Sequence, residues 1–440
     1  MQQWANVANI NFIEVQEPHT QGDMRFTFSS LIDDKDAVGY SPSPAGIFFE
    51  SSGDVWINPD VSDLQIGSPG FLALVHQIGF ALGLKPTNEM NEMNDEALFG
   101  LEDTSQYTIM SDNAYEEAGW QEGPFLVEPV APMLYDILAI QFLYGKNITT
   151  NSNDTLYQYP EGSVLETVWD TGGIDTFDLS NQNLDSIINL NAGEFSSIGD
   201  IVYEMNNNGE LNPISQVAVD NITIAYGVEI ENAIGGNGDD EIIGNHLANR
   251  IIGGNGDDYI EGNKGIDTVI YTENSDLYTI ETNENTLFIT LNDSSNETDT
   301  LDGIERLQFN DVTLAMDING NAGQAYRLYQ AAFNRTPDKN GLGFWIDSLD
   351  KGESLEKVSV GFIQSQEFSS LYGENLTDNL FLSSLYNNVL HRELDAEGGS
   401  FWMNQLQVQP RENVLIGFSE SNENQLQIIG DIQNGIELIT

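Results

Sequence analysis

Cysteine is absent from this chain of 440 residues, so no disulfide can stabilise its fold. An extracellular protein without disulfides needs another kind of cross-link, and bound calcium is the candidate here. Apolar runs of about 18 residues, the length that crosses a membrane, are also missing, which predicts no transmembrane helix. The N-terminus does not have the pattern of a signal peptide.

Basic residues are scarce, because 14 Lys and Arg stand against 70 Asp and Glu, for a net charge of −56. Such a surface repels nucleic acid and anionic membranes, which excludes both as partners. Two explanations of the acidic excess stay open. The carboxylates could keep a halophilic or marine protein in solution, or they could bind many calcium ions, which prefer clustered carboxylate oxygens.

The stretch VHQIGFALGLKP, residues 75–86, has the frame of a zinc-binding helix without its full ligand set. Zinc peptidases use two His four residues apart on one helix face and a Glu beside the first His as general base. His76 occupies the first position, but Gln77 replaces the Glu and Phe80 replaces the second His. An amide cannot accept the proton of the attacking water, and a phenyl ring cannot bind zinc. Taken alone, the stretch is equally well explained as an amphipathic core helix.

Four other stretches resemble the serralysin family of zinc metallopeptidases, in the family's order. They are QQWANVANINFIEV (2–15), GDVWIN (53–58), EDTSQYTIMSD (102–112) and PMLYDILAIQFLYG (132–145). The third resembles the family's Met-turn, with Met110 as the methionine below the metal and Asp112 in the place of a Tyr. Pro86 stands at the position of the third His. The resemblance extends from residue 1 to about residue 270.

The resemblance implies a metzincin-like α/β domain over residues 1–150 that is catalytically inactive, because the departures fall on catalytic positions and spare the scaffold. We therefore expect no zinc. The spacing of apolar residues predicts a helix over 71–84 and a strand over 9–15. Serralysins have a propeptide and further strands before the point where Met1 stands, so the resemblance implies a truncated or mis-started chain.

Residues 235–270 repeat every nine residues, as GGNGDDEII, GNHLANRII, GGNGDDYIE and GNKGIDTVI. Six residues of a unit suit a tight turn, because Gly allows positive φ and Asp and carbonyl oxygens suit calcium. The other three suit a short strand whose apolar eighth residue points inward. A glycine-rich linker would not keep this register. The inward positions are Ile242, Ile251, Ile260 and Val269. The positions expected to face calcium are Gly235, Asn237, Asp239, Asp240, Asn249, Gly253, Asn255, Asp257, Asp258 and Asp267.

The stretch VWDTGGIDTFDLS (168–180) resembles the first calcium-binding turn of the serralysin C-terminal domain. This resemblance implies Asp170, Gly172 and Asp175 as ligand positions. Together with the repeats, it predicts a parallel β-roll of the RTX type, closed by a β cap, over residues 151–318.

The sequence of residues 319–440 predicts helices and contains a second internal repeat. AYRLYQAAFNRTPDKNGLGFW (325–345) recurs as LSSLYNNVLHRELDAEGGSFW (382–402), 57 residues later. The region resembles a two-repeat helical domain of unknown function found in secreted and surface-layer-like bacterial proteins. We expect Arg335 and Arg392 to pair with nearby carboxylates, and carbohydrate binding is the alternative role.

These features predict a multi-domain α+β protein with a metzincin-like domain, an RTX β-roll and a helical C-terminal domain. The expected function is that of a secreted calcium-binding protein with a structural or binding role at the cell surface, in a matrix or in a filament. Its expected partners are calcium and either further copies of the chain or a cell-surface polymer. The family resemblance implies type I secretion. An active zinc metalloendopeptidase with unusual ligands is the alternative, and an inhibitor or decoy that keeps the cleft is a third interpretation.

Overall fold

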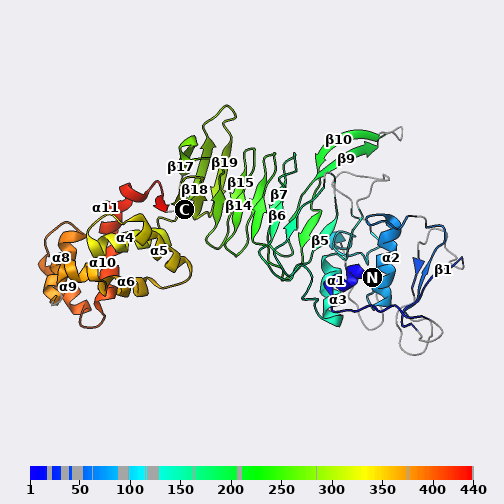
Figure 1. Cartoon of the computed structure of the whole chain (residues 1–440), viewed down its shortest axis with the longest axis horizontal. Helices are drawn as coiled ribbons and strands as arrows, with labels where there is room; N and C mark the ends of the chain where they lie inside the picture. The colour runs from blue at the N-terminus through cyan, green and yellow to red at the C-terminus, as the bar shows by residue number, and fades with distance from the viewer. Residues whose placement is uncertain are drawn as a thin grey trace. The chain divides into compact units, whose positions relative to one another are not determined.

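A computed structural model of the chain describes residues 1–16, 22–30, 39–41, 53–61, 63–87, 98, 100–113, 115, 128–160, 162, 164–205, 211–283, 285–373 and 376–438. The chain forms two compact units, Met1–Glu261 and Gly262–Thr440, and each is described here by itself. Figure 1 shows the elements of both units, coloured from blue at the N-terminus to red at the C-terminus.

Unit one begins with short helices and a small sheet. The helical elements are α1 (Gln2–Val7), α2 (Pro69–Ala81), η1 (Gly100–Glu102) and α3 (Leu134–Tyr144). The strands are β1 (Phe26–Phe28), β2 (Gly39–Tyr40) and β3 (Val55–Ile57). Strand β3 pairs in parallel with β1 and antiparallel with β2.

Helix α2 starts where its sequence provides both an N-cap and a proline. Ser68 accepts the amide hydrogen of Phe71 at 3.1 Å, and Pro69 takes the first helical position. The helix ends at Ala81, before Gly83, whose φ of +98° is incompatible with a right-handed helix. The helix predicted over 71–84 is confirmed, and its bounds are shifted toward the N-terminus.

The strand predicted over residues 9–15 is wrong. Residues 9–16 carry no strand, and none of the described strands pairs with this segment. After a single bridge between Ala8 and Lys146, Val15 is left 39% exposed. Alternating apolar residues form a strand only where a neighbouring strand satisfies their backbone groups, and the described residues provide no such neighbour for this segment.

The rest of unit one consists mainly of short parallel strands. Its strands are β4 (Leu156–Tyr157), β5 (Glu166–Val168), β6 (Thr176–Asp178), β7 (Ile187–Asn189), β8 (Phe195–Ser196), β9 (Asp200–Met205), β10 (Leu211–Val217), β11 (Ile222–Ile224), β12 (Asn232–Ile234), β13 (Glu241–Ile243), β14 (Arg250–Ile252) and β15 (Tyr259–Glu261). Successive strands alternate between two parallel sheets, because β4, β6, β12 and β14 are neighbours in one and β7, β13 and β15 in the other. Outside these sheets, β9 and β10 form an antiparallel hairpin, and β11 pairs with β5 and β8.

The nine-residue repeat appears in the structure with the predicted register. Ile242 lies opposite Ile260, 18 residues away, because two units separate neighbouring strands of one sheet. The apolar residues in position eight, Ile242, Ile251, Ile260 and Val269, are each completely buried. The prediction that position eight points inward is confirmed.

Unit two combines antiparallel strands with eight α-helices among its described residues. Its strands are β16 (Thr268–Ile270), β17 (Tyr278–Asn283), β18 (Thr286–Leu291), β19 (Thr298–Asp302), β20 (Arg306–Gln308), β21 (Thr313–Ala315) and β22 (Ile436–Leu438), with a 3-10 turn, η2 (Ser275–Leu277). Strands β17, β18 and β19 form a meander. Strand β20 pairs with β16 in parallel and with β21 antiparallel, and β22 pairs antiparallel with β21.

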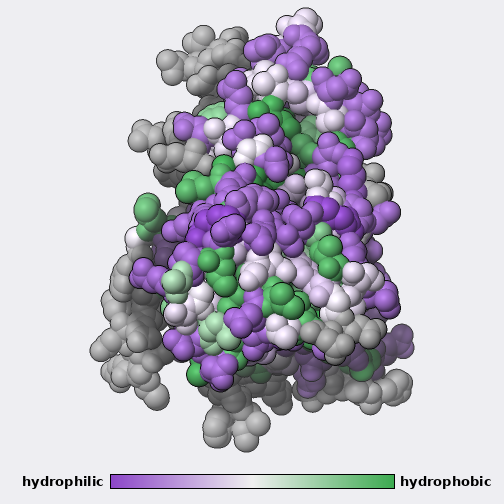
Figure 2. Space-filling view, turned by 90° about the vertical axis from the view of Figure 1, so that its left-hand side faces the viewer, coloured by the Kyte–Doolittle hydropathy of each residue, from purple (hydrophilic) through white to green (hydrophobic). Residues whose placement is uncertain are grey.

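The helices lie in sequence between β21 and β22. They are α4 (Asn321–Phe333), α5 (Lys339–Asp350), α6 (Leu355–Ile363), α7 (Gln366–Tyr372), α8 (Asp378–Asn388), α9 (Ala396–Gln405), α10 (Arg411–Ser419) and α11 (Asn422–Ile432). No helix among the described residues has the length and apolarity needed to cross a membrane. On the side shown in Figure 2, hydrophilic residues predominate and hydrophobic residues form separate small patches.

The 57-residue repeat of the sequence is also a structural repeat. Asp338 caps α5 by accepting the amide hydrogen of Gly341 at 2.8 Å, and Asp395 caps α9 in the same way. Trp345 packs over Gly361, where an added Cβ would lie 2.7 Å from the ring. Trp402 and Gly417 repeat this contact at 2.6 Å.

Candidate functional site

Helix α2 carries His76 and Phe80 side by side. The His76 Nδ1 lies 2.6 Å from the carbonyl oxygen of Ile109, and because a carbonyl can only accept, Nδ1 carries the donated hydrogen. The centres of the His76 and Phe80 rings are 5.1 Å apart. Burial lowers the pKa of His76, although the Ile109 carbonyl and the Asp112 charge act in the opposite direction. The neutral imidazole therefore presents Nε2 as its acceptor atom.

Met110 lies directly against α2. A Cβ on Gly79 would lie 2.8 Å from Met110 Sδ and 2.9 Å from Trp4 Cζ2, so only glycine allows this approach. Trp4 is completely buried and donates its indole hydrogen to the Val75 carbonyl at 3.0 Å. The helix is thereby held between α1 and the turn that contains Met110.

Asp136 organises that turn and was missed by the sequence analysis. Its carboxylate accepts hydrogen bonds from Thr108 Oγ1 at 2.6 Å and from the amides of Ile109 and Met133 at 2.8 Å each. Burial raises the pKa of Asp136 to about 6, and the three hydrogen bonds oppose this increase. The only signal in the sequence was one acidic residue in the otherwise uncharged helix LYDILAIQFLY.

The remaining zinc-type positions do not add a metal ligand. Gln77 has a buried Oε1 without a hydrogen bond, and Pro86, at the third ligand position, has no ligand atom in its side chain. Among the residues that the structure describes, no three His, Cys, Asp or Glu side chains form a group that could hold a metal ion. What persists is the hydrogen bond from the first His to a backbone carbonyl, the kind of contact that orients a metal-binding imidazole.

The repeat turns bring buried carboxylates onto backbone amides. Asp240 accepts hydrogen bonds from the amides of Gly236 at 2.5 Å and Ser186 at 2.6 Å, and its own amide donates to Asp258 Oδ1 at 2.9 Å. Asp240, Asp258 and Asp267 are each at most 2% exposed. Burial raises the pKa of Asp240. Buried carboxylates are stabilised when a cation binds to them.

Glycines allow these turns to stack closely. Gly254 has a φ of +124°, and a Cβ there would overlap the carbonyl oxygen of Gly236. Side chains would also clash at two further glycines. A Cβ on Gly235 would overlap the Gly253 carbonyl oxygen, and a Cβ on Gly253 would overlap the Asp258 carboxylate.

The more exposed positions of the same turns form a ladder. The amide of Asp257 donates to Asp239 Oδ1 at 2.8 Å, and Asn255 Nδ2 donates to Asn237 Oδ1 at 2.7 Å. Eight of the predicted calcium positions thus lie in the two stacked turns at 235–240 and 253–258, whereas Asn249 lies in a turn with a different set of contacts.

The first predicted turn contains a carboxylate oxygen without a hydrogen bond. Asp175 is completely buried, its Oδ1 accepts the amide hydrogen of Thr155 at 2.8 Å, and its Oδ2 has no hydrogen-bond partner. Asp170 accepts hydrogen bonds from the Tyr157 hydroxyl at 2.6 Å and from the amide of Gly172 at 2.8 Å. Burial raises the pKa of Asp175 to about 6.

Glu231 completes this turn and was not predicted. Its Oε2 accepts the amide hydrogen of Asp175 at 2.7 Å, across 56 residues of sequence. Asp170, Asp175 and Glu231 supply oxygen atoms, the type of donor that calcium prefers, but among the described residues their carboxylates do not form a three-ligand metal group.

In the helical repeat, Arg335 and Arg392 are engaged within the domain. Arg335 pairs with Glu367 at 2.7 Å and lies over the ring of Tyr329, and Arg392 pairs with Glu423 at 2.8 Å and lies over Tyr386. The prediction that both pair with nearby carboxylates is confirmed. These contacts occupy the guanidinium groups that the carbohydrate-binding alternative would use.

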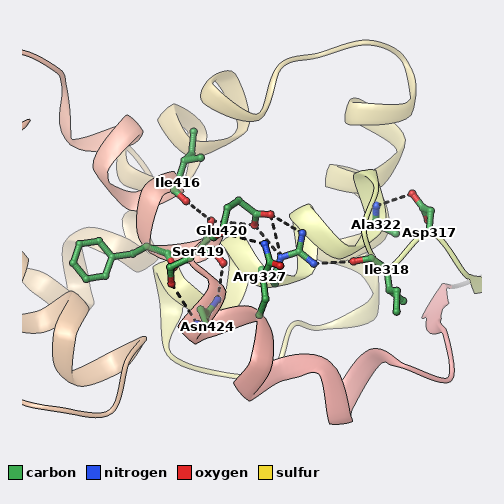
Figure 3. A network of polar contacts seen from close by, with 11 residues as sticks. Asp317, Ile318, Ala322, Arg327, Ile416, Ser419, Glu420 and Asn424 are labelled. Atoms are coloured by element: carbon green, nitrogen blue, oxygen red, sulfur yellow. Dashed lines mark hydrogen bonds and ion pairs between the residues drawn. The ribbon is translucent and has the colours of Figure 1, made fainter. Parts of the chain in front are cut away.

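A buried ion pair, also missed from the sequence, joins the two repeats. Arg327 of α4 contacts both oxygens of Glu420 at the end of α10, at 2.6 Å for the shortest bond, and donates to the carbonyl of Ile318 (Figure 3). The Arg327 side chain is only 5% exposed. No spacing rule predicts a partner 93 residues away.

Comparison with known proteins agrees with this geometry. Residues 135–339 match the family described as peptidase M10 serralysin C terminal, and residues 321–371 and 360–428 match a domain of unknown function, DUF4214. The chain is therefore similar to the serralysins, including their C-terminal region, and to that second domain.

Three individual relatives, two of them named serralysin, show the extent of this similarity. The chain is 33% identical to serralysin of Photorhabdus laumondii over 278 residues, which are 57% of this chain and 52% of the relative. It is 35% identical to serralysin A of Dickeya chrysanthemi over 267 residues, 55% of this chain and 51% of the relative. Metalloprotease AprA of Pseudomonas entomophila is 32% identical over 278 residues, 57% of this chain and 52% of the relative. The chain thus spans about half the length of the curated relatives it matches.

Proposed function

We propose that this chain is a secreted calcium-binding protein whose serralysin-like domain is catalytically inactive. In this proposal, residues 1–150 form a metzincin-like domain, residues 151–318 an RTX β-roll with its cap, and residues 319–440 a helical domain. The relatives named serralysin support an extracellular location reached by type I secretion. The role is structural or binding, through self-association or attachment to a cell-surface polymer.

The observation that supports calcium binding is the buried Asp175 Oδ2, which has no hydrogen bond and lies beside Asp170 and Glu231. A bound calcium ion would supply two positive charges to these oxygens. The stacked turns around Asp240 and Asp258 offer a second set of buried carboxylates. If binding occurs only in the folded state, a hundredfold excess of calcium over its Kd adds about 2.7 kcal/mol per independent site.

The proposal that the domain is catalytically inactive rests on the side chains around His76. A phenyl ring lies where the second imidazole would be, and the neutral Gln77 amide cannot act as the general base. His76 alone does not hold zinc, because structural and catalytic zinc sites use three or four protein ligands.

Metal content of the purified protein tests both parts. After dialysis against calcium, we expect several calcium ions and much less than one zinc ion per chain by mass spectrometry. Zinc near one equivalent that is lost in His76→Ala, together with casein cleavage, would establish the active metalloendopeptidase instead. We also expect Phe80→His alone to remain inactive, because Gln77 still provides no base.

Thermal melting tests calcium as the stabilising ligand. We expect the melting temperature to fall in chelator, and Asp258→Ala to lose most of that calcium-dependent difference. The exposed Asp60→Ala is the matched control and should keep it. An identical melting curve with and without chelator would remove calcium from the proposal.

A further inference from the structure

One turn of the repeat array differs from the others in carrying no carboxylate in position six. The unit GNHLANRII, residues 244–252, has Asn249 where the other three units have Asp240, Asp258 and Asp267. Asn249 is completely buried and Asn245, four residues earlier, is 4% exposed. We call Asn245 and Asn249 the asparagine pair.

The asparagine pair uses every hydrogen of its two side-chain amides. Asn249 Nδ2 donates to the carbonyl of Glu231 at 2.9 Å and to Asn245 Oδ1 at 3.1 Å. Asn245 Nδ2 donates to the carbonyls of Ile230 at 2.8 Å and Leu190 at 3.1 Å. Three backbone carbonyl oxygens from neighbouring segments therefore receive amide hydrogens.

The acceptor atoms of the asparagine pair are satisfied as well. Asn249 Oδ1 accepts the amide hydrogen of Asn245 at 2.9 Å, and Asn245 Oδ1 accepts the amide hydrogen of Leu247 at 2.9 Å. Asp240 makes the corresponding bond to the amide of Gly236 in its own turn, at 2.5 Å. The turn geometry is thus shared, while the charge in position six is not.

A neutral network of this kind has no need of a cation. Buried carboxylates repel one another and lose hydration energy, so their turns gain stability when a cation binds. A buried amide network with every donor and acceptor paired is stable without added charge. The amide hydrogens also occupy carbonyl oxygens of the kind that calcium would otherwise contact.

We propose that the asparagine pair is a built-in substitute for a calcium ion, so that the 244–249 turn binds no metal and stays folded when calcium is removed. The array then has one calcium-independent turn that lies, in sequence, between two calcium-dependent turns at 235–240 and 253–258. Asn249, a predicted calcium position, then has the opposite role. The contrast between turns rests on the proposed function, but the stabilising role of the pair does not.

Hydrogen exchange of the full chain, followed by mass spectrometry in calcium and in chelator, tests this proposal. We expect peptides within 244–252 to keep their protection in chelator, and peptides within 235–241 and 253–259 to lose it. Asn249→Ala should remove the protection of 244–252 in both conditions, whereas the exposed control Asn283→Ala should leave it unchanged. Equal loss of protection in all three segments, or an unchanged pattern in Asn249→Ala, would overturn the proposal.

Asn249→Asp provides a second, independent readout. The new carboxylate removes the donor to the Glu231 carbonyl, so we expect protection of 244–252 to become calcium-dependent. Protection of 244–252 from hydrogen exchange that remains independent of calcium in this variant would contradict the proposal. If the wild-type chain binds no calcium at all, the proposed function fails, and the effect of Asn249→Ala in chelator still decides whether the pair stabilises its turn.

Discussion

His76 donates its Nδ1 hydrogen to the carbonyl oxygen of Ile109 at 2.6 Å, which ties helix α2 to the turn that contains Met110. In a zinc enzyme, this bond would direct Nε2 at the metal. Here Nε2 belongs to a partly buried ring beside Phe80, and the same contact serves the packing of the domain. The hydrogen bond thereby holds the helix and the turn together.

The first prediction concerns pH. Burial lowers the pKa of His76 in the folded state below its ordinary value of 6.5. As the pH falls through 6.5, His76 becomes protonated in the unfolded chain but stays neutral in the folded chain, so the free energy of unfolding decreases. At saturating calcium, we expect wild type to lose more unfolding free energy than His76→Gln between pH 7.5 and pH 5 (roughly the range around the ordinary value).

Chemical denaturation across that range measures the effect. Asp136 has a raised pKa and acts with the opposite sign, since its stability contribution grows as the pH falls from about 6. It is present in both proteins and therefore cancels in the comparison. Equal pH slopes for wild type and His76→Gln would show that His76 titrates as in the unfolded chain.

The second prediction compares two glycines. Gly254→Ala should destabilise the array by more than about 2 kcal/mol, because φ is +124° and the new Cβ would overlap the Gly236 carbonyl. Gly343→Ala in α5 meets nothing within 4 Å and should stabilise its helix by up to about 1 kcal/mol. Denaturant titration in calcium measures both. A neutral Gly254→Ala would mean that the turns do not stack as closely as the structure shows.

The repeat turns show how much of the fold could be predicted from the sequence. The register of the array followed from the spacing of Asp and Ile alone, because each unit repeats one local geometry. Glu231 and Asp136 could not be found in this way, because their partners are 56 and 27 residues distant and obey no period. The strand expected over 9–15 failed for a related reason, since a strand depends on a neighbour that local alternation does not specify.

The third prediction concerns the buried ion pair of the helical repeats. Arg327→Met should cost about 3–5 kcal/mol, because Glu420 would keep its charge at a mostly buried site without its partner. The double variant Arg327→Met, Glu420→Leu should recover a large part of that loss. Lys351→Met breaks an exposed pair with Asp347 and should cost at most about 1 kcal/mol. Urea unfolding of all three variants gives the comparison, and similar costs for Arg327→Met and Lys351→Met would contradict the assigned burial.

The fourth prediction tests the proposed boundary of the helical domain. Arg306 of β20 pairs with Asp317 at 2.6 Å and with Asp350 of α5 at 2.5 Å, and β22 pairs with β21. A fragment of residues 319–440 loses both contacts, whereas a fragment of residues 262–440 keeps them. We expect the longer fragment to be more stable by at least about 2 kcal/mol, by circular dichroism during thermal or urea unfolding. Equal stability of the helical signal in both would place the boundary at residue 319 after all.

The pairing of β21 with β22 has a consequence for modular exchange. Ala315 and Ile436 are partners in adjacent antiparallel strands, so the helical region leaves the sheet and returns to it at neighbouring points. Replacing the intervening residues with a two-residue turn such as Asn-Gly would convert the two strands into an ordinary β-hairpin. The helical region is thus an insertion between two paired strands. Another domain whose ends lie close together could replace it without changing the strand register.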